Sequence, residues 1–114
     1  MLWHKLTDIS QLQDILNLSK ESHLNAVLLF KHSTRCSISS MALSRLESKW
    51  IDDEKIPAYY LDLLNHRDIS NEIENLFSVE HASPQVLLIK NESCIYHNSH
   101  SGISATAILA ASLG

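Results

Sequence analysis

One short, uninterrupted run of apolar residues, Ala26-Val27-Leu28-Leu29-Phe30, constrains the fold of this chain more than any other feature. A strand with one face in water alternates apolar and polar residues, whereas a strand buried on both faces is continuously apolar. The run has the length of a strand and is far too short for a helix that crosses a bilayer. We therefore expect a strand from Ala26 to Lys31, inside a sheet that is covered on both faces.

The segments on either side of this strand alternate between helical and extended patterns. Apolar residues that recur at intervals of three and four predict helices, and short apolar or alternating runs predict strands. The expected helices span about 8–22, 37–50, 68–77 and 104–113, and the expected strands span 2–6, 26–31, 58–63, 85–89 and 94–97. The expected caps of the first and third helices are Asp8 or Ser10, and Asp68 or Ser70. Their expected inner faces carry Ile9, Leu12, Ile15 and Leu16, and Ile69, Ile73, Leu76 and Phe77.

The resulting order of elements is β-α-β-α-β-α-β-β-α. Alternating βαβ units place helices on both faces of a parallel sheet, and the ββα end adds a hairpin. This layout predicts an α/β protein with a thioredoxin-like fold, in which a central mixed sheet of four or five strands is flanked by helices on both faces. A chain of 114 residues has room for one such domain, residues 1–114.

Composition and charge exclude several classes of function. Hydrophobic residues make up 45% of the chain and charged residues 19%, as in ordinary globular proteins rather than disordered ones. The net charge is −4 and the basic residues form no cluster, which argues against nucleic acid as a partner. No signal-peptide pattern or membrane span is visible, so the expected location is the cytoplasm. Two cysteines cannot build the disulfide framework of a small secreted domain.

The most informative polar feature is Cys36, which follows the apolar strand and a polar loop and directly precedes the second helix. The first N–H groups of a helix have no internal partner and carry the positive end of the helix dipole. A sulfur in that place is stabilised as thiolate, the nucleophile in disulfide exchange. An inert buried cysteine is the alternative interpretation, but the polar surroundings favour a reactive one.

No other position in the sequence offers a second active thiol. A dithiol oxidoreductase carries another cysteine three residues after the first, where this chain has Ser39. Cys94 lies in the last predicted strand, and a disulfide would need its Cα within about 7 Å of the Cα of Cys36. We therefore expect Cys94 to be structural and Cys36 to work alone, by exchange with a low-molecular-weight thiol.

A proline at the head of a predicted central strand marks the same site. Proline cannot donate to a β-ladder, so Pro84 is expected to hold a special turn, with a cis Ser83-Pro84 bond next to Cys36. In thioredoxin-like domains the residue before this proline, here Ser83, pairs through its backbone with the bound partner.

Seven histidines raise the question of a metal site. The candidate ligands are Cys36, His81, His97 and His100. No second compact pair of ligands accompanies His97-x-x-His100, so no metal is expected. The segment from Tyr96 to Gly102, which connects the last strand to the last helix, has a different interpretation. Its Ser and Asn side chains, Ser99 among them, and the amides of the next helix suit an anionic ligand such as an acidic thiol.

Four segments make the chain resemble the monothiol bacilliredoxin (YtxJ-like) family of the bacillithiol system over nearly its whole length. They are 30–39, 66–73, 81–85 and 97–100. The family's active segment reads T-C-P-I-S, and here Arg35 and Ser37 replace the threonine and the proline that flank the cysteine. The resemblance implies that Cys36 removes bacillithiol, or a similar small thiol, from S-thiolated client proteins. The residues expected to contact the thiol or the client are Arg35, Ser37, Ser39, Ser83, Pro84, Ser99 and His100.

Other interpretations stay open. One is a monothiol glutaredoxin-like enzyme that uses glutathione, and another is a non-enzymatic module that carries a thiol or an iron–sulfur cluster on Cys36. Monothiol glutaredoxins that hold clusters read C-G-F-S, whereas this chain reads Cys36-Ser37-Ile38-Ser39. An absorbance spectrum of the purified protein distinguishes a cluster carrier from the enzymes. A redox-inactive partner protein of the same fold is disfavoured by the intact Cys36.

Overall fold

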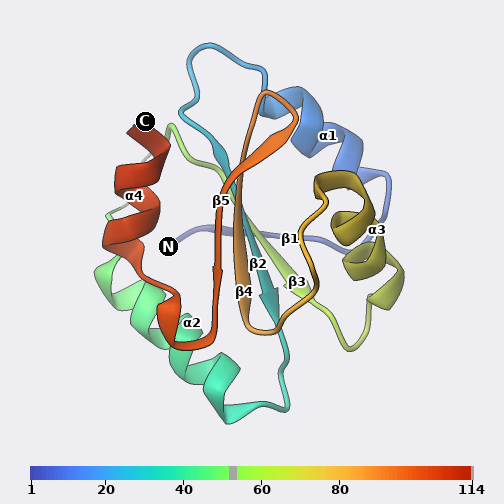
Figure 1. The fold of residues 1–114 in the computed structure, drawn as a ribbon, viewed down its shortest axis with the longest axis vertical. Helices are drawn as coiled ribbons and strands as arrows, with labels where there is room; N and C mark the ends of the chain where they lie inside the picture. Colours follow the sequence, from blue (N-terminus) through green and yellow to red (C-terminus); the bar gives the residue numbers. More distant parts are fainter. Residues whose placement is uncertain (52–53, 114) are drawn as a thin grey trace.

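One mixed sheet of five strands forms the centre of the protein (Figure 1). The computed structural model describes residues 1–51 and 54–113. The strands are β1 (Trp3–Lys5), β2 (Val27–His32), β3 (Ala58–Asp62), β4 (Gln85–Lys90) and β5 (Ser93–Ser99). The helices are α1 (Gln11–Leu18), α2 (Ser37–Lys49), α3 (Arg67–Phe77), the 3-10 turn η1 (His100–Gly102) and α4 (Ala105–Leu113).

The order of elements along the chain and the mixture of parallel and antiparallel strands match the layout predicted from the sequence. The order across the sheet is β1-β3-β2-β4-β5, with β1, β3 and β2 parallel to one another. β4 runs antiparallel to β2, and β5 antiparallel to β4. The thioredoxin-like fold is therefore confirmed, and the strand expected at residues 2–6 is present as a short edge strand, Trp3–Lys5.

Strand β2 is buried on both faces, as its continuous apolar run predicted. Val27 and Leu29 face one hydrophobic core, which α1 and α3 cover, whereas Leu28 and Phe30 face a second core, which α2 and α4 cover. Figure 1 shows the two pairs of helices on opposite sides of the sheet. The carboxyl end of β2 is therefore enclosed by helices on both faces, and the chain must leave the sheet there through a loop.

Helix α1 ends several residues earlier than its periodicity suggested, at Leu18. Side chains of serine compete with the backbone for hydrogen bonds and so favour helix ends. The hydroxyl of Ser19 donates to the carbonyl of Leu16 and accepts the N–H of Glu92, in the turn between β4 and β5. This contact between distant parts of the chain stops the helix.

The start of α3 also differs from the expectation. The helix begins at Arg67 with His66 in the N-cap position, so a cap at Asp68 or Ser70 was wrong. Asp68 lies in the first turn, where a carboxylate still interacts favourably with the helix dipole. Ser70 is 4% exposed and faces the interior.

Two residues expected on inner faces point outward instead. Ile9 is 45% exposed because α1 begins only after it, and Leu76 is 39% exposed at the border of the apolar stripe of α3. The other residues expected on these two faces are buried or half-buried in the core. No helix in the described ranges is long and apolar enough to cross a membrane.

Candidate active site

Cys36 lies where β2 passes through a short loop into α2. It takes the N-cap position of the helix, with an extended backbone (φ −109°, ψ 120°). Its N–H donates to the carbonyl of Ser33 at 3.1 Å, and its carbonyl accepts the N–H of Ser40 at 3.1 Å. The side chain is half-buried and the thiol is free. A half-buried cysteine thus occupies the N-cap position of a 13-residue helix, whose first amides have no partner within the helix, and its side chain accepts no capping hydrogen bond.

The loop before Cys36 is held from inside by Ser39 and His32. The Ser39 hydroxyl is 2.6 Å from His32 Nδ1 and accepts the N–H of Ser33 at 3.1 Å. Since its oxygen accepts from Ser33, its proton is available to Nδ1, which fits a neutral imidazole. Burial lowers the pKa of His32, which also favours the neutral imidazole. Ser39 is 0% exposed, so it orients the loop and does not face a bound thiol.

Pro84 lies at the same end of the sheet. The Ser83-Pro84 bond is cis, as predicted. Gln85 follows and stands opposite Lys31 in the β2–β4 ladder, so the register places Pro84 at the carboxyl end of β2. The β2–α2 loop, the start of β4 and η1 all lie at the lower end of the sheet in Figure 1. The Ser83 side chain is half-buried, and its hydroxyl oxygen is enclosed without a hydrogen-bond partner among the described residues.

The turn η1 links this proline to α2. The N–H of His100 donates to the carbonyl of Pro84 at 3.0 Å, and His100 takes a positive φ of 53°. The guanidinium of Arg45, in α2, donates to the carbonyl of His100 at 3.3 Å and to that of Ile103 at 3.3 and 3.4 Å. Arg45 was not among the predicted site residues, because nothing in its sequence neighbourhood distinguishes it from a solvated arginine.

A shallow hollow of about 140 Å³ lies between η1 and the first turns of α2. It is lined by Ile38, Met41, Arg45, His100 and Ser101. Ile38 is 55% exposed and Met41 66% exposed, so the surface that follows Cys36 is apolar and open. The hollow includes His100 but not Ser99, which is half-buried in β5. Arg35 and Ser37 are exposed on either side of Cys36.

Cys94 lies in β5 and packs against the core that α1 and α3 cover. Its thiol donates to the carbonyl of Tyr96 at 3.3 Å, and burial raises its pKa. Both features are those of a structural cysteine. Within the described ranges, no three side chains of histidine, cysteine, aspartate or glutamate are grouped as a metal site would need.

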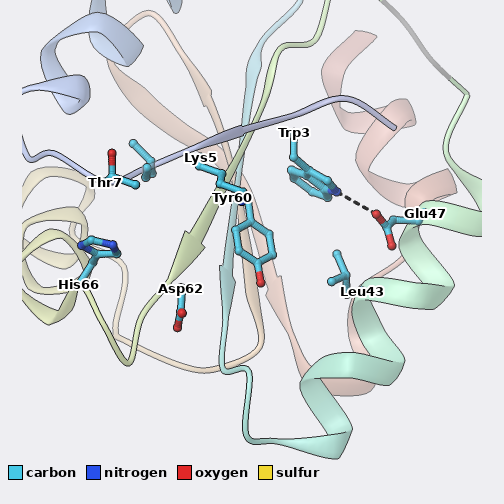
Figure 2. A pocket seen from close by; sticks show the side chains of 9 residues that line it. Trp3, Lys5, Thr7, Leu43, Glu47, Tyr60, Asp62 and His66 are labelled. Carbon is cyan, nitrogen blue, oxygen red and sulfur yellow. Dashed lines mark hydrogen bonds between the residues drawn. The ribbon is translucent and has the colours of Figure 1, made fainter.

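A larger groove of about 440 Å³ lies between α2 and the edge of the sheet that β1 and β3 form (Figure 2). The indole N–H of Trp3 donates to Glu47 at 3.1 Å across it, as Figure 2 shows. Tyr60 and Asp62 line it from β3, at the carboxyl end of the parallel strands. This groove and the hollow beside η1 share no lining residue, and Cys36 lines neither of them.

Comparisons with known proteins agree with this geometry. The model of the family described as monothiol bacilliredoxin BrxC matches residues 4–108. A solved protein described as a candidate oxidoreductase with a thioredoxin fold is 27% identical, with a TM-score of 0.77, over 96% of this chain and 92% of its own. The thioredoxin of Malassezia sympodialis is 17% identical (TM-score 0.71, 98% and 89% covered). The thioredoxin of Fasciola hepatica is 12% identical (TM-score 0.72, 96% of each chain covered).

Proposed function

This chain belongs to the monothiol bacilliredoxin family, and on that premise we propose that it removes bacillithiol, or a similar low-molecular-weight thiol, from protein mixed disulfides through Cys36. The observation that carries the proposal is a single half-accessible cysteine at the start of α2. The position that holds a second cysteine in dithiol enzymes holds Ser39, which is enclosed in the protein. A thiol–disulfide oxidoreductase built in this way needs an external thiol to complete its cycle.

The proposed cycle has two exchange steps. In the first, the Cys36 thiolate attacks the small-thiol sulfur of the client's mixed disulfide. A new S–S bond joins Cys36 to the small thiol, and the client leaves as its thiolate, which takes up a proton from water. In the second, the thiolate of another small-thiol molecule attacks the small-thiol sulfur now bound to Cys36. The products are the Cys36 thiolate and the symmetrical small-thiol disulfide, so no electrons are gained or lost overall.

The neighbouring elements supply binding surfaces for both partners. Ser83 is the residue whose backbone would pair with an extended client segment, and the exposed Ile38 and Met41 would contact its side chains. The small thiol would lie toward η1, where His100 and the hollow adjoin α2. Ser99 adjoins this place from β5. Arg35 and Ser37 flank the sulfur, where a cationic group and a hydroxyl favour an acidic thiol.

Mass spectrometry of the intact protein tests the proposal. The protein is mixed with a client protein that carries bacillithiol on one cysteine, and with the same client carrying glutathione. We expect the mass of one bacillithiol to appear on Cys36 as the client is released, and further bacillithiol to remove it. Cys36→Ser should abolish the transfer, and Cys94→Ser should retain it.

Two outcomes would contradict the proposal. Faster transfer from the glutathionylated client would favour the glutaredoxin-like alternative. An absorbance band of an iron–sulfur cluster in the freshly purified protein, lost in Cys36→Ser, would favour a carrier module.

A further inference from the structure

A buried ammonium group lies on the opposite side of β2 from His32 and Ser39, and the proposed chemistry does not use it. Lys31 is 0% exposed, although it is the penultimate residue of β2. Its Nζ donates to His81 Nδ1 at 3.2 Å and to the backbone carbonyl of Ser70 at 3.5 Å. Burying a charge costs free energy unless the charge is paired, so a buried lysine at this position needs a structural or functional explanation.

His81 covers this ammonium from the loop that connects α3 to β4. Its backbone N–H donates to the Glu74 carboxylate, and its Nδ1 also lies 3.3 Å from the Ser70 hydroxyl. An ammonium can only donate hydrogen bonds, so Nδ1 must accept, and the ring must be neutral with its proton on Nε2. His81 is thus fastened to both β2 and α3, while the residue as a whole is exposed to solvent.

The loop that His81 attaches, residues 78–84, contains Ser83 and Pro84. Gln85, directly opposite Lys31 in the ladder, donates to the carbonyl of Glu80 and so holds the same loop. The hydroxyl oxygen of Ser83 and Oε1 of Gln85 are buried, and neither has a partner among the described residues. These two atoms do not anchor the segment, which is held by the Gln85–Glu80 hydrogen bond, by the N–H of His100 at the Pro84 carbonyl, and by the contact through His81.

We propose that Lys31 and His81 are positioning residues that hold the segment around Ser83 ready for a client, and that protonation of His81 releases it. The proposal rests on the proposed function, because it assigns client docking to Ser83. A protonated His81 would present an N–H to the Lys31 ammonium, and two like charges would then face each other. The loop would lose this attachment, whereas the hydrogen bonds that hold Cys36 at the start of α2 would remain.

The charged groups around His81 set the direction of this pH dependence. Lys31 faces it from β2, and Glu74 and Arg67 act on it from α3. Burial lowers the pKa of His81, the charges of Lys31 and Arg67 lower it further, and the Glu74 carboxylate opposes them. The contact with Lys31 is therefore intact at neutral pH and is lost in acid, below the ordinary range of histidine.

Kinetics with a client peptide that carries a bacillithiol mixed disulfide test this proposal between pH 5 and 8. We expect KM for the peptide to rise about fivefold in acid, the equivalent of one lost hydrogen bond. The rate of iodoacetamide labelling of Cys36 should depend on pH in the same way in the wild type and in His81→Gln. His81→Gln keeps an acceptor that does not titrate, so KM should stay near the wild-type value at neutral pH and lose its acid rise. His81→Ala should raise KM about fivefold across the whole range.

Lys31→Met gives the sharpest test, because it removes the ammonium that donates to Nδ1 of His81. KM for the peptide should be raised about fivefold already at neutral pH and should no longer rise in acid, and a merely structural role of Lys31 would not remove this pH dependence. His23→Gln, which changes an exposed histidine far from the site, should behave as wild type. An acid rise in KM that persists in His81→Gln or in Lys31→Met would overturn the proposal.

Failure of the proposed function would look different. If no peptide transfers bacillithiol to Cys36 at any pH, the proposed function fails, and hydrogen exchange of the amides of residues 79–83 then tests the contact alone. Faster exchange in acid for the wild type, absent in His81→Gln, supports the contact. Equal exchange in the two proteins overturns it.

Discussion

The two sulfur atoms of this protein differ in surroundings, although both thiols are free and half-buried. Cys36 lies at a helix start, with exposed Arg35 and Ser37 beside it. Cys94 packs against apolar side chains in β5, donates to a backbone carbonyl, and has a pKa raised by burial. Because the thiolate is the reactive form, the second sulfur should react much more slowly.

We expect iodoacetamide to label Cys36 at least tenfold faster than Cys94 at pH 7.5, the equivalent of about 1.4 kcal/mol in activation free energy. Peptide mapping of the native protein after short exposures measures both rates, and labelling in denaturant provides the control in which the two should become similar. Equal rates in the native protein would show that Cys94 is a second active thiol.

Predictions of where a residue lies in the fold succeeded where that position depends on its neighbours in the sequence. The place of Cys36 follows from a strand, a polar loop and a helix in succession, all of which are local patterns. The inward position of Ser39 does not follow from local patterns, because its hydrogen bond to His32 joins two elements. The same holds for Lys31, which reads as the polar end of a strand and is in fact enclosed by α3 and His81.

At the scale of elements, the candidate site depends on a chain of contacts among α2, η1 and β4. Arg45 joins α2 to η1 through the carbonyls of His100 and Ile103, and the N–H of His100 joins η1 to Pro84. A planar guanidinium can donate to two carbonyls at once, which a lysine cannot do in the same geometry. These contacts fix the hollow beside Met41, where we place the small thiol.

We therefore expect Arg45→Met to raise KM for bacillithiol disulfide substrates about three- to tenfold, with the free energy of unfolding lowered by about 1 kcal/mol. Steady-state kinetics and urea denaturation measure the two effects. Lys49→Met, an exposed change at the end of the same helix, is the matched control. An unchanged KM in Arg45→Met would separate η1 from the site.

The existence of nearly all elements was predictable, because buried stripes and runs recur with the period of a helix or a strand. The residues at which these elements begin and end were less predictable. The early end of α1 depends on Ser19 bonding to the turn at Glu92, and the start of α3 at Arg67 depends on how the chain leaves β3. Such contacts join parts of the chain that are distant in sequence, and no local pattern reveals them.

At the scale of the whole molecule, two apolar cores lie on either side of the sheet, and most of the buried polar side chains among the described residues gather near the carboxyl end of β2. On one face these groups are His32 and Ser39, and on the other Lys31 and Ser70. The fully apolar stretches of β2 and β4 thus anchor the fold, while the polar end of the sheet carries the candidate site. A buried ammonium in that region links global stability to pH.

Burial lowers the pKa of Lys31 from an ordinary 10.5 to about 8, against the opposing attraction of Glu74. Below pH 8 the lysine is protonated in both folded and unfolded chains, and the folded state bears the full cost of the buried charge. Between about 8 and 10.5 the folded protein has released this proton and the unfolded chain still holds it, so stability rises with pH. The Cys94 thiol acts in the opposite sense above pH 9, because its pKa is raised by folding.

Comparison of the wild type with Lys31→Met isolates the contribution of the lysine. The other groups that titrate in the alkaline range, Cys94 and the tyrosines, are present in both proteins. The free energy of unfolding of Lys31→Met, relative to the wild type, should fall steadily from pH 7.5 to 10, toward a total change of about 3 kcal/mol by pH 10.5. Urea denaturation in the presence of a reductant measures this difference at half-unit intervals. A difference that stays constant across the range would mean that Lys31 titrates as an exposed lysine, and that the polar end of the sheet is open to water.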